Sequence, residues 1–312
     1  MYLIIGNLLL GLSLFLGGMA VMRFSLQALA GPRLKNILCC LTDNLPSGII
    51  AGAGITAFIQ SSSAVLAVLI GLVNAGVIPF SNVFGVIFGA NIGTTFTIQL
   101  ISFQLSDYAL WISIGGLIIT LYGVYKRWDG LKYSGLAVFG FGQLFLGMRH
   151  MGFSLILLES YERFMLVMLE VREHNIFGLI LGMLLTGVSQ SSSAITGIII
   201  ALLNDEVLTL KSALPVLLGC NVGTCMTALL ASLGSDYRGK RTALIHLIFN
   251  VTGAVVFFIF LNPFVRLISL TTDSPVRQFA NAHTIFNVAN TLLLLPFIPF
   301  IDFLVRLILP GE

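Results

Sequence analysis

The chain has 312 residues, of which 57% are hydrophobic, and its 16 Lys and Arg with its 13 Asp and Glu make up only 9%. Soluble domains carry about 25% charged residues, so this composition all but excludes a soluble enzyme, a nucleic-acid-binding domain or a disordered chain. The sequence therefore predicts an all-α polytopic membrane protein.

Seven stretches are long and apolar enough for a membrane helix, which needs about 20 residues. In chain order they are Leu3–Met22, 83–104, 108–125, 133–153, 212–233, 242–261 and 283–308. The first has neither a basic leader nor a small-residue cleavage site, so we expect a span rather than a signal peptide. We expect Pro296 and Pro299 to kink the last one.

Two further apolar stretches, 46–78 and 176–204, do not fit simple spans. Each is too long for one crossing, yet two arms of about 15 residues reach only about 22 Å apiece, against a core of about 30 Å. Each carries the sequence QSSS at its centre, Gln60–Ser63 and Gln190–Ser193. We therefore predict two re-entrant hairpins with polar tips near mid-membrane, which are tolerated only inside protein or beside water.

The basic residues suggest an orientation. One assignment, with the N-terminus outside and the C-terminus in the cytoplasm, puts three basic clusters on the cytoplasmic side. These are Arg23 with Arg33 and Lys35, Lys126 with Arg127 and Lys132, and Arg238 with Lys240 and Arg241. Arg266 and Arg277 fall outside as mild exceptions. We expect a multi-pass protein of the cytoplasmic membrane.

The two halves repeat each other. Gln60 and Gln190 are 130 positions apart, as are Asn91 and Asn221, and LFLG and FSL upstream also recur. We predict a first repeat at 1–130 (span, hairpin 46–78, broken helix 83–104, span 108–125) and a second at 131–262 (span, hairpin 176–204, broken helix 212–233, span 242–261). An extra C-terminal helix region, 263–312, follows. The orientation above inverts the two copies, which is typical of secondary transporters with a site at the repeat interface.

Each QSSS cluster offers three hydroxyls and an amide beside a helix that begins near Ser62 or Ser192. Unpaired backbone N–H groups at a helix N-terminus, with hydroxyls nearby, form an anion site. Two such ends from opposite sides can surround one small oxyanion. The alternative is a serine-rich turn that satisfies its own backbone.

The second repeated motif is GANIGTT (89–95) and GCNVGTC (219–225), which we expect to interrupt a span. Its glycines permit unwinding or close helix approach. Its Asn and Thr oxygens, with unwound carbonyls, suit sodium. The alternative is a Gly-Asn kink sealed by a neighbouring helix.

Charge placement favours sodium coupling. Only Asp302 falls within a predicted span, so no mid-membrane carboxylate can relay protons. Neither motif contains Lys or Arg to balance an anion. Helix ends and co-bound cations would then have to balance it.

With both copies of both motifs in place, the chain resembles the type II sodium–phosphate cotransporter family over both repeats. The resemblance implies sodium-coupled transport of inorganic phosphate, with no catalytic residue, no transition metal and no cofactor beyond the coupling ion. It implies phosphate binding by Ser61, Ser62, Ser63, Ser191, Ser192, Ser193, Asn91 and Asn221. It implies sodium binding by Gln60, Gln190, Thr94, Thr95 and Thr224. Many bacterial relatives add a soluble regulatory helical domain, which these 312 residues lack.

Other interpretations remain open at this point. The same fold could carry sulfate or a dicarboxylate, or act as a passive channel. An intramembrane serine hydrolase would need His246 or His283 as a base beside a QSSS serine. The pairs His246/Asn250 and His283/Asn287 could instead line the path or join helices, and Arg149 could attract substrate or snorkel. The expected partners are phosphate, sodium and the lipid bilayer, with no nucleic acid, and a homodimer is allowed for.

Overall fold

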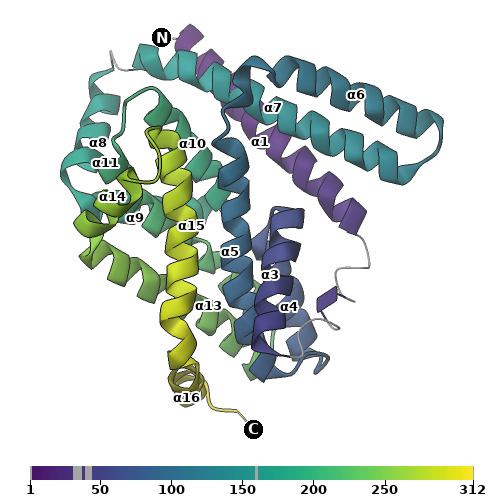
Figure 1. Ribbon diagram of the computed structural model, residues 1–312, viewed down its shortest axis with the longest axis vertical. Coiled ribbons are helices and arrows are strands. Elements are labelled where there is room, and N and C mark those ends of the chain that lie inside the picture. Colours follow the sequence, from purple (N-terminus) through teal and green to yellow (C-terminus); the bar gives the residue numbers. More distant parts are fainter. Residues whose placement is uncertain (1, 31–36, 39–43, 159–160, 312) are drawn as a thin grey trace.

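The computed structural model describes residues 2–30, 37–38, 44–158 and 161–311. Within these ranges every regular element is helical, as the composition predicts (Figure 1). Five helical segments are long and apolar enough to cross a membrane, Gly6–Ala30, Phe80–Ile101, Leu210–Ser232, Tyr237–Ile259 and Pro275–Ile308. Predicted spans 108–125 and 133–153 also form helices, but the number of crossings stays a prediction. Arg33 and Lys35 lie outside the described residues.

Three long helices, α1 (Tyr2–Ala30), α6 (Ala109–Tyr125) and α7 (Asp129–Leu158), pack together along their lengths (Figure 1). Glycines bring α1 and α7 into backbone contact, since a Cβ on Gly18 would lie 2.6 Å from the carbonyl oxygen of Gly140. The first helix continues to Ala30 instead of ending at Met22. Arg23, which we expected to follow the end of this helix, therefore lies inside it, which corrects our expectation.

Both predicted hairpins form two helices joined by two residues. The first consists of α3 (Leu45–Ile59) and α4 (Ser62–Asn74), and the second of α9 (Asn175–Ser189) and α10 (Ser192–Asn204). The arms have 15 and 13 residues in both copies. Helix α8 (Glu162–Glu173) precedes the second hairpin.

The helix after each hairpin packs on its first arm: α5 (Val83–Ile101) on α3, and α11 (Leu210–Gly223) on α9. The motif glycines serve this close approach, since a Cβ would lie 2.1 Å from the Ile49 carbonyl oxygen at Gly89 and 2.0 Å from that of Leu179 at Gly219. Helix α5 runs without interruption through 89–95, contrary to the broken helix we expected there. The glycines replace side chains at a contact, so the backbone has no need to unwind.

In the second copy only Thr224 separates α11 from α12 (Cys225–Ser232), and its φ of −61° and ψ of −22° remain helical. The short connectors η1 (Phe80–Asn82) and η2 (Leu105–Asp107) flank α5.

The last predicted span is divided. After α13 (Tyr237–Ile259) and α14 (Leu261–Ser269), α15 (Pro275–Leu294) ends before Pro296, and η3 (Leu295–Phe297) leads into α16 (Ile298–Ile308). Helix α16 is seen end-on below α15 (Figure 1), so the chain turns sharply rather than kinking slightly. Proline lacks the N–H that would continue the helix.

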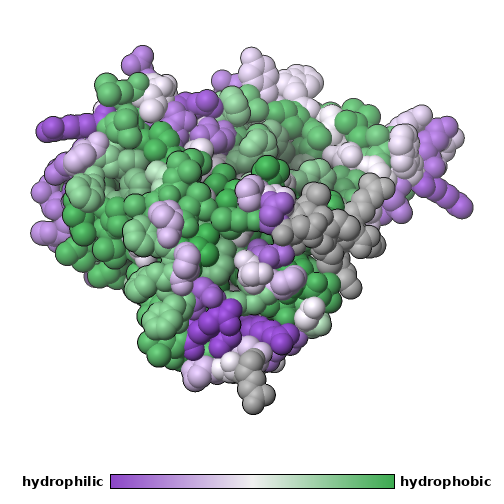
Figure 2. Space-filling view, turned by 60° about the horizontal axis from the view of Figure 1, so that its bottom comes forward, coloured by the Kyte–Doolittle hydropathy of each residue, from purple (hydrophilic) through white to green (hydrophobic). Residues whose placement is uncertain are grey.

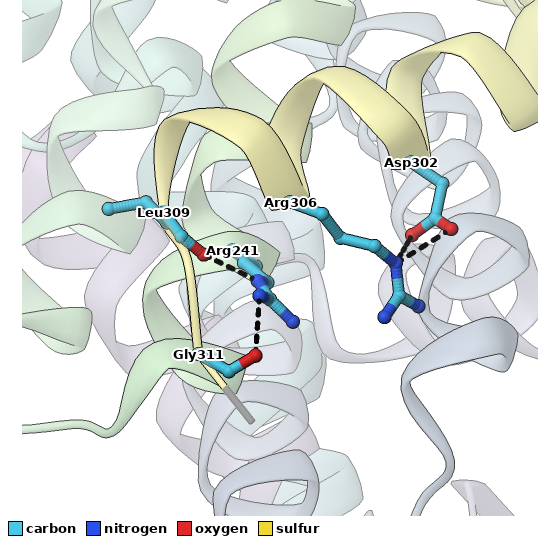
Figure 3. Close-up of polar contacts among 5 residues, drawn as sticks. All are labelled: Arg241, Asp302, Arg306, Leu309 and Gly311. Atoms are coloured by element: carbon cyan, nitrogen blue, oxygen red, sulfur yellow. Dashed lines mark hydrogen bonds and ion pairs between the residues drawn. The ribbon is translucent and has the colours of Figure 1, made fainter.

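Arginines fix the chain after this turn. Arg241 on α13 donates from Nε to the Leu309 carbonyl oxygen (2.9 Å) and from Nη2 to that of Gly311 (3.3 Å), while Arg306 pairs with Asp302 along α16 (Figure 3). Hydrophilic side chains gather at this end of the molecule, and broad apolar areas cover the flanks (Figure 2). Exposed apolar side chains on α6, including Trp111 at 71% and Ile118 at 61%, suit a lipid-facing surface.

Candidate functional site

The two QSSS turns have the same backbone geometry. Gln60 and Gln190 are left-handed, with φ of 61° and 53°, and each ends the first arm of its hairpin. The next residue is extended, and its hydroxyl caps the second arm: Ser61 accepts from the Ala64 N–H and Ser191 from the Ala194 N–H, both at 3.3 Å. Helices α4 and α10 thus begin at Ser62 and Ser192, as predicted. One serine in each turn, Ser61 or Ser191, therefore does bond to the backbone of its own turn.

The two turns meet at one small cavity. Its volume is about 20 Å³, roughly the space of one water-sized sphere. Every residue of both QSSS clusters lines it, together with Thr94 of α5 and Arg23 of α1. The N-terminal ends of α4 and α10 both border the cavity, and each carries a partial positive charge from unpaired N–H groups. The arrangement can hold a small anion by hydroxyls and backbone amides from two sides.

Arg23 is the cavity residue that our sequence reasoning missed. Its Nη2 donates to the Ser193 hydroxyl at 2.7 Å and its Nη1 to the Ser191 hydroxyl at 3.4 Å. We expected no cationic side chain at the site and assigned Arg23 to the membrane flank. The apolar run that continues beyond Arg23 to Ala30 is the signal that could have placed it inside the helix.

The two glutamines differ in their surroundings despite their matching backbones. Gln60 is 4% exposed, and its Nε2 donates to the Ala57 carbonyl oxygen. Its Oε1 is buried and accepts no hydrogen bond from the residues that the structure describes. Gln190 is exposed. A buried, unpaired amide oxygen beside a cavity is a suitable ligand for a cation.

The second motif contributes less to the cavity than we expected. Asn91 and Asn221 are buried, and each donates to a carbonyl oxygen one turn earlier on its own helix, at 2.9 Å in both cases. The threonine hydroxyls also bond to their own helices, those of Thr94, Thr95 and Thr224. Of these five residues, Thr94 is the one that lines the cavity.

The histidines lie elsewhere. His283 Nε2 is 3.3 Å from Asn221 Oδ1, so it joins α15 to α11 as an interhelical contact. His246 is buried, and neither of its ring nitrogens forms a hydrogen bond among the described residues. No described hydrogen bond joins either histidine to a QSSS serine, as a hydrolytic pair would require. Arg149 lines a separate cavity of about 310 Å³ with Asn204 and Asp205.

Comparison with known proteins places the chain in a family. The family model described as Na+/Pi-cotransporter matches residues 14–152 and 158–292. "Uncharacterized protein YqeW" of Bacillus subtilis is 33% identical over 302 residues, covering 96% of each chain. "Putative inorganic phosphate export protein YjbB" of Escherichia coli K12 is 23% identical over 94% of this chain, which spans about half (53%) of that protein.

A more distant relative is a human protein. "Sodium-dependent phosphate transport protein 2C" of Homo sapiens is 40% identical over 79 residues, which make up 24% of this chain and 13% of that protein. No solved structure matches the chain. The family model covers most of the sequence and describes transporters, not enzymes. The chain belongs to the Na+/Pi-cotransporter family.

Proposed function

We propose that this protein couples sodium movement to the transport of inorganic phosphate across the cytoplasmic membrane. The convergence of two QSSS turns on one cavity is the observation that carries the proposal. Two helix N-termini and a ring of hydroxyls supply many short donors from opposite sides, which matches the four oxygens of a tetrahedral anion.

The proposed phosphate ligands are the QSSS hydroxyls, Ser61–Ser63 and Ser191–Ser193. Asn91 and Asn221 are the weaker part of the proposed set, because both amides bond to their own helices outside the cavity. For sodium, Gln60 and Thr94 are supported best, because both line the cavity and no described donor bonds to Gln60 Oε1. Gln190 also lines the cavity, whereas Thr95 and Thr224 do not.

The proposed scaffold is an inverted repeat with two re-entrant hairpins. Matching arm lengths, matching turn dihedrals and matching glycine contacts, all 130 residues apart, support the repeat. The basic clusters support a cytoplasmic C-terminus and an external N-terminus. Opposite orientation of the two copies would present the two tips to each other from the two sides of the membrane.

The substrate and the direction of transport both need a direct test. Purified protein in liposomes should take up radiolabelled phosphate when an inward sodium gradient is present, and much less when potassium replaces sodium. Sulfate and succinate at the same concentration should compete poorly. Uptake that ignores sodium would indicate a passive channel, and strong competition by sulfate or succinate would indicate another anion. Loading the vesicles with phosphate and reversing the gradient tests export.

A further inference from the structure

Arg23 is a partly buried cation whose guanidinium has no acidic partner among the described residues. The described ion pairs join Lys132 to Asp129, His174 to Glu170 and Arg306 to Asp302. Arg23 instead donates to two neutral hydroxyls, and its buried Nε has no acceptor among the described residues. A charge withdrawn from water without a counter-ion is costly, so this site is arranged to receive negative charge.

The arginine at position 23 occurs in only one copy of the repeat. The sequence around it, MRFSL at 22–26, corresponds to MGFSL at 151–155, so glycine stands at 152 where arginine stands at 23. The flanking serines behave alike, since Ser25 and Ser154 are both buried and both donate to the carbonyl oxygen four residues earlier. The local helix structure therefore does not require an arginine at position 23. Its place in the lining of the cavity gives a reason for it.

Arg23 also occupies one side of the cavity. Its guanidinium spans to Ser191 and Ser193 on the second turn, and the remaining volume of about 20 Å³ is too small for a tetrahedral oxyanion with five heavy atoms. No described hydrogen bond links it to the first turn. An anion entering between the turns would meet the guanidinium and the two hydroxyls that it holds.

We propose that Arg23 is the fixed positive charge that binds the transported oxyanion, and that Ser191 and Ser193 hold it until the anion displaces it. This inference rests on the proposed function and adds a charge-selecting residue to that site. A planar guanidinium can donate two parallel hydrogen bonds to two phosphate oxygens. One fixed charge and two helix ends favour a divalent over a monovalent anion, and they reduce the share of charge that sodium must balance.

Equilibrium binding of radiolabelled inorganic phosphate to the purified protein, in saturating sodium, tests this. Arg23→Gln keeps hydrogen-bond donors for the serines but removes the charge, so its Kd for phosphate should rise about tenfold or more. The Kd of Arg23→Lys for phosphate should lie between those of the unsubstituted protein and Arg23→Gln. The lysine ammonium keeps the charge but lacks the planar, two-donor geometry of the guanidinium. Lys240→Gln, which removes an exposed charge, should bind phosphate as the unsubstituted protein does.

Two readouts separate anion binding from a merely structural role. More of the phosphate is divalent at pH about 8 than at about 6, so Arg23→Gln should lose more affinity at the higher pH. At the same phosphate concentration, phosphate should raise the Tm of the unsubstituted protein more than that of Arg23→Gln. Equal losses at both pH values, or phosphate binding by Arg23→Gln as tight as in the unsubstituted protein, would overturn the inference.

Failure of the inference and failure of the proposed function are distinguishable. Phosphate binding that depends on Arg23, together with transport that ignores sodium, would uphold the inference and reject sodium coupling. Sodium-driven transport with unchanged kinetics in Arg23→Gln would reject the inference and uphold sodium coupling. An unsubstituted protein that binds no phosphate would overturn both.

Discussion

At the scale of single residues, the two QSSS turns are alike in backbone and unlike in environment. Gln60 is buried, with an Oε1 that has no hydrogen-bond partner in the described part of the chain, and Gln190 is exposed. Both side chains line the cavity. A cation bound at the first turn would gain a ligand that is already desolvated, whereas one at the second turn would compete with water for the amide. Function is therefore expected to be divided unequally between the two turns.

This inequality gives a prediction. Gln60→Asn keeps an amide and tolerates the left-handed backbone, but it withdraws the oxygen by one methylene. We expect the sodium concentration for half-maximal phosphate uptake to rise about fivefold, which corresponds to about 1 kcal/mol. Gln190→Asn is the matched control and should change this concentration less. Equal effects in the two variants would show that burial of the first amide has no bearing on sodium.

The QSSS serines and Arg23 differ in how far the sequence predicts their place in the site. The repeated QSSS predicts the turns and the starts of α4 and α10, because helix capping is a local property. The inverted repeat predicts that the two turns meet. Arg23 was missed, because its place depends on how α1 lies across the second hairpin. The histidines were read as path or interface residues, and packing favours the interface for His283, which contacts Asn221.

At the scale of elements, helix contact explains the second motif better than unwinding does. The sequence predicts that GANIGTT interrupts the helix, because its glycines permit unwinding as well as close helix approach. In the fold, Gly89 and Gly93 face α3 at backbone distance. The interhelical packing of α5 on α3 outweighs the propensity cost, and α5 stays continuous. Sequence alone could not decide between these two uses of glycine, because both need the absence of a side chain.

A methyl group at this contact should therefore destabilise the protein. Gly89→Ala would place Cβ 2.1 Å from the Ile49 carbonyl oxygen, so α3 and α5 would have to separate. We expect a loss of about 1–3 kcal/mol in unfolding free energy, measured as a lower Tm in detergent. Gly54→Ala on α3 is the control, because nothing lies within 4 Å of its Cβ. Its Tm should be unchanged or higher. Equal Tm values for the two variants would argue against the close contact.

At the scale of the whole molecule, the account depends on orientation. Asp107, between α5 and α6, and Lys126, after α6, are both exposed and lie at opposite ends of α6. The basic clusters put Lys126 in the cytoplasm and Asp107 outside. The orientation of α6 therefore tests the proposed inverted repeat directly.

Cysteine labelling tests the orientation. In a variant without the native cysteines, Asp107→Cys should react with a membrane-impermeant thiol reagent in intact cells. Lys126→Cys should react only after the cells are permeabilised. The reverse pattern would invert the orientation. Labelling of both residues in intact cells would mean that α6, with 17 residues, does not cross the membrane.

The central claim is that sodium and phosphate move together through the cavity between the two turns. Its most direct test is concentrative transport in liposomes that begin with equal phosphate on both sides. An inward sodium gradient should drive the internal phosphate above the external concentration, and an ionophore that collapses the gradient should release the excess. Internal phosphate that never exceeds the external concentration while the sodium gradient persists would contradict the account.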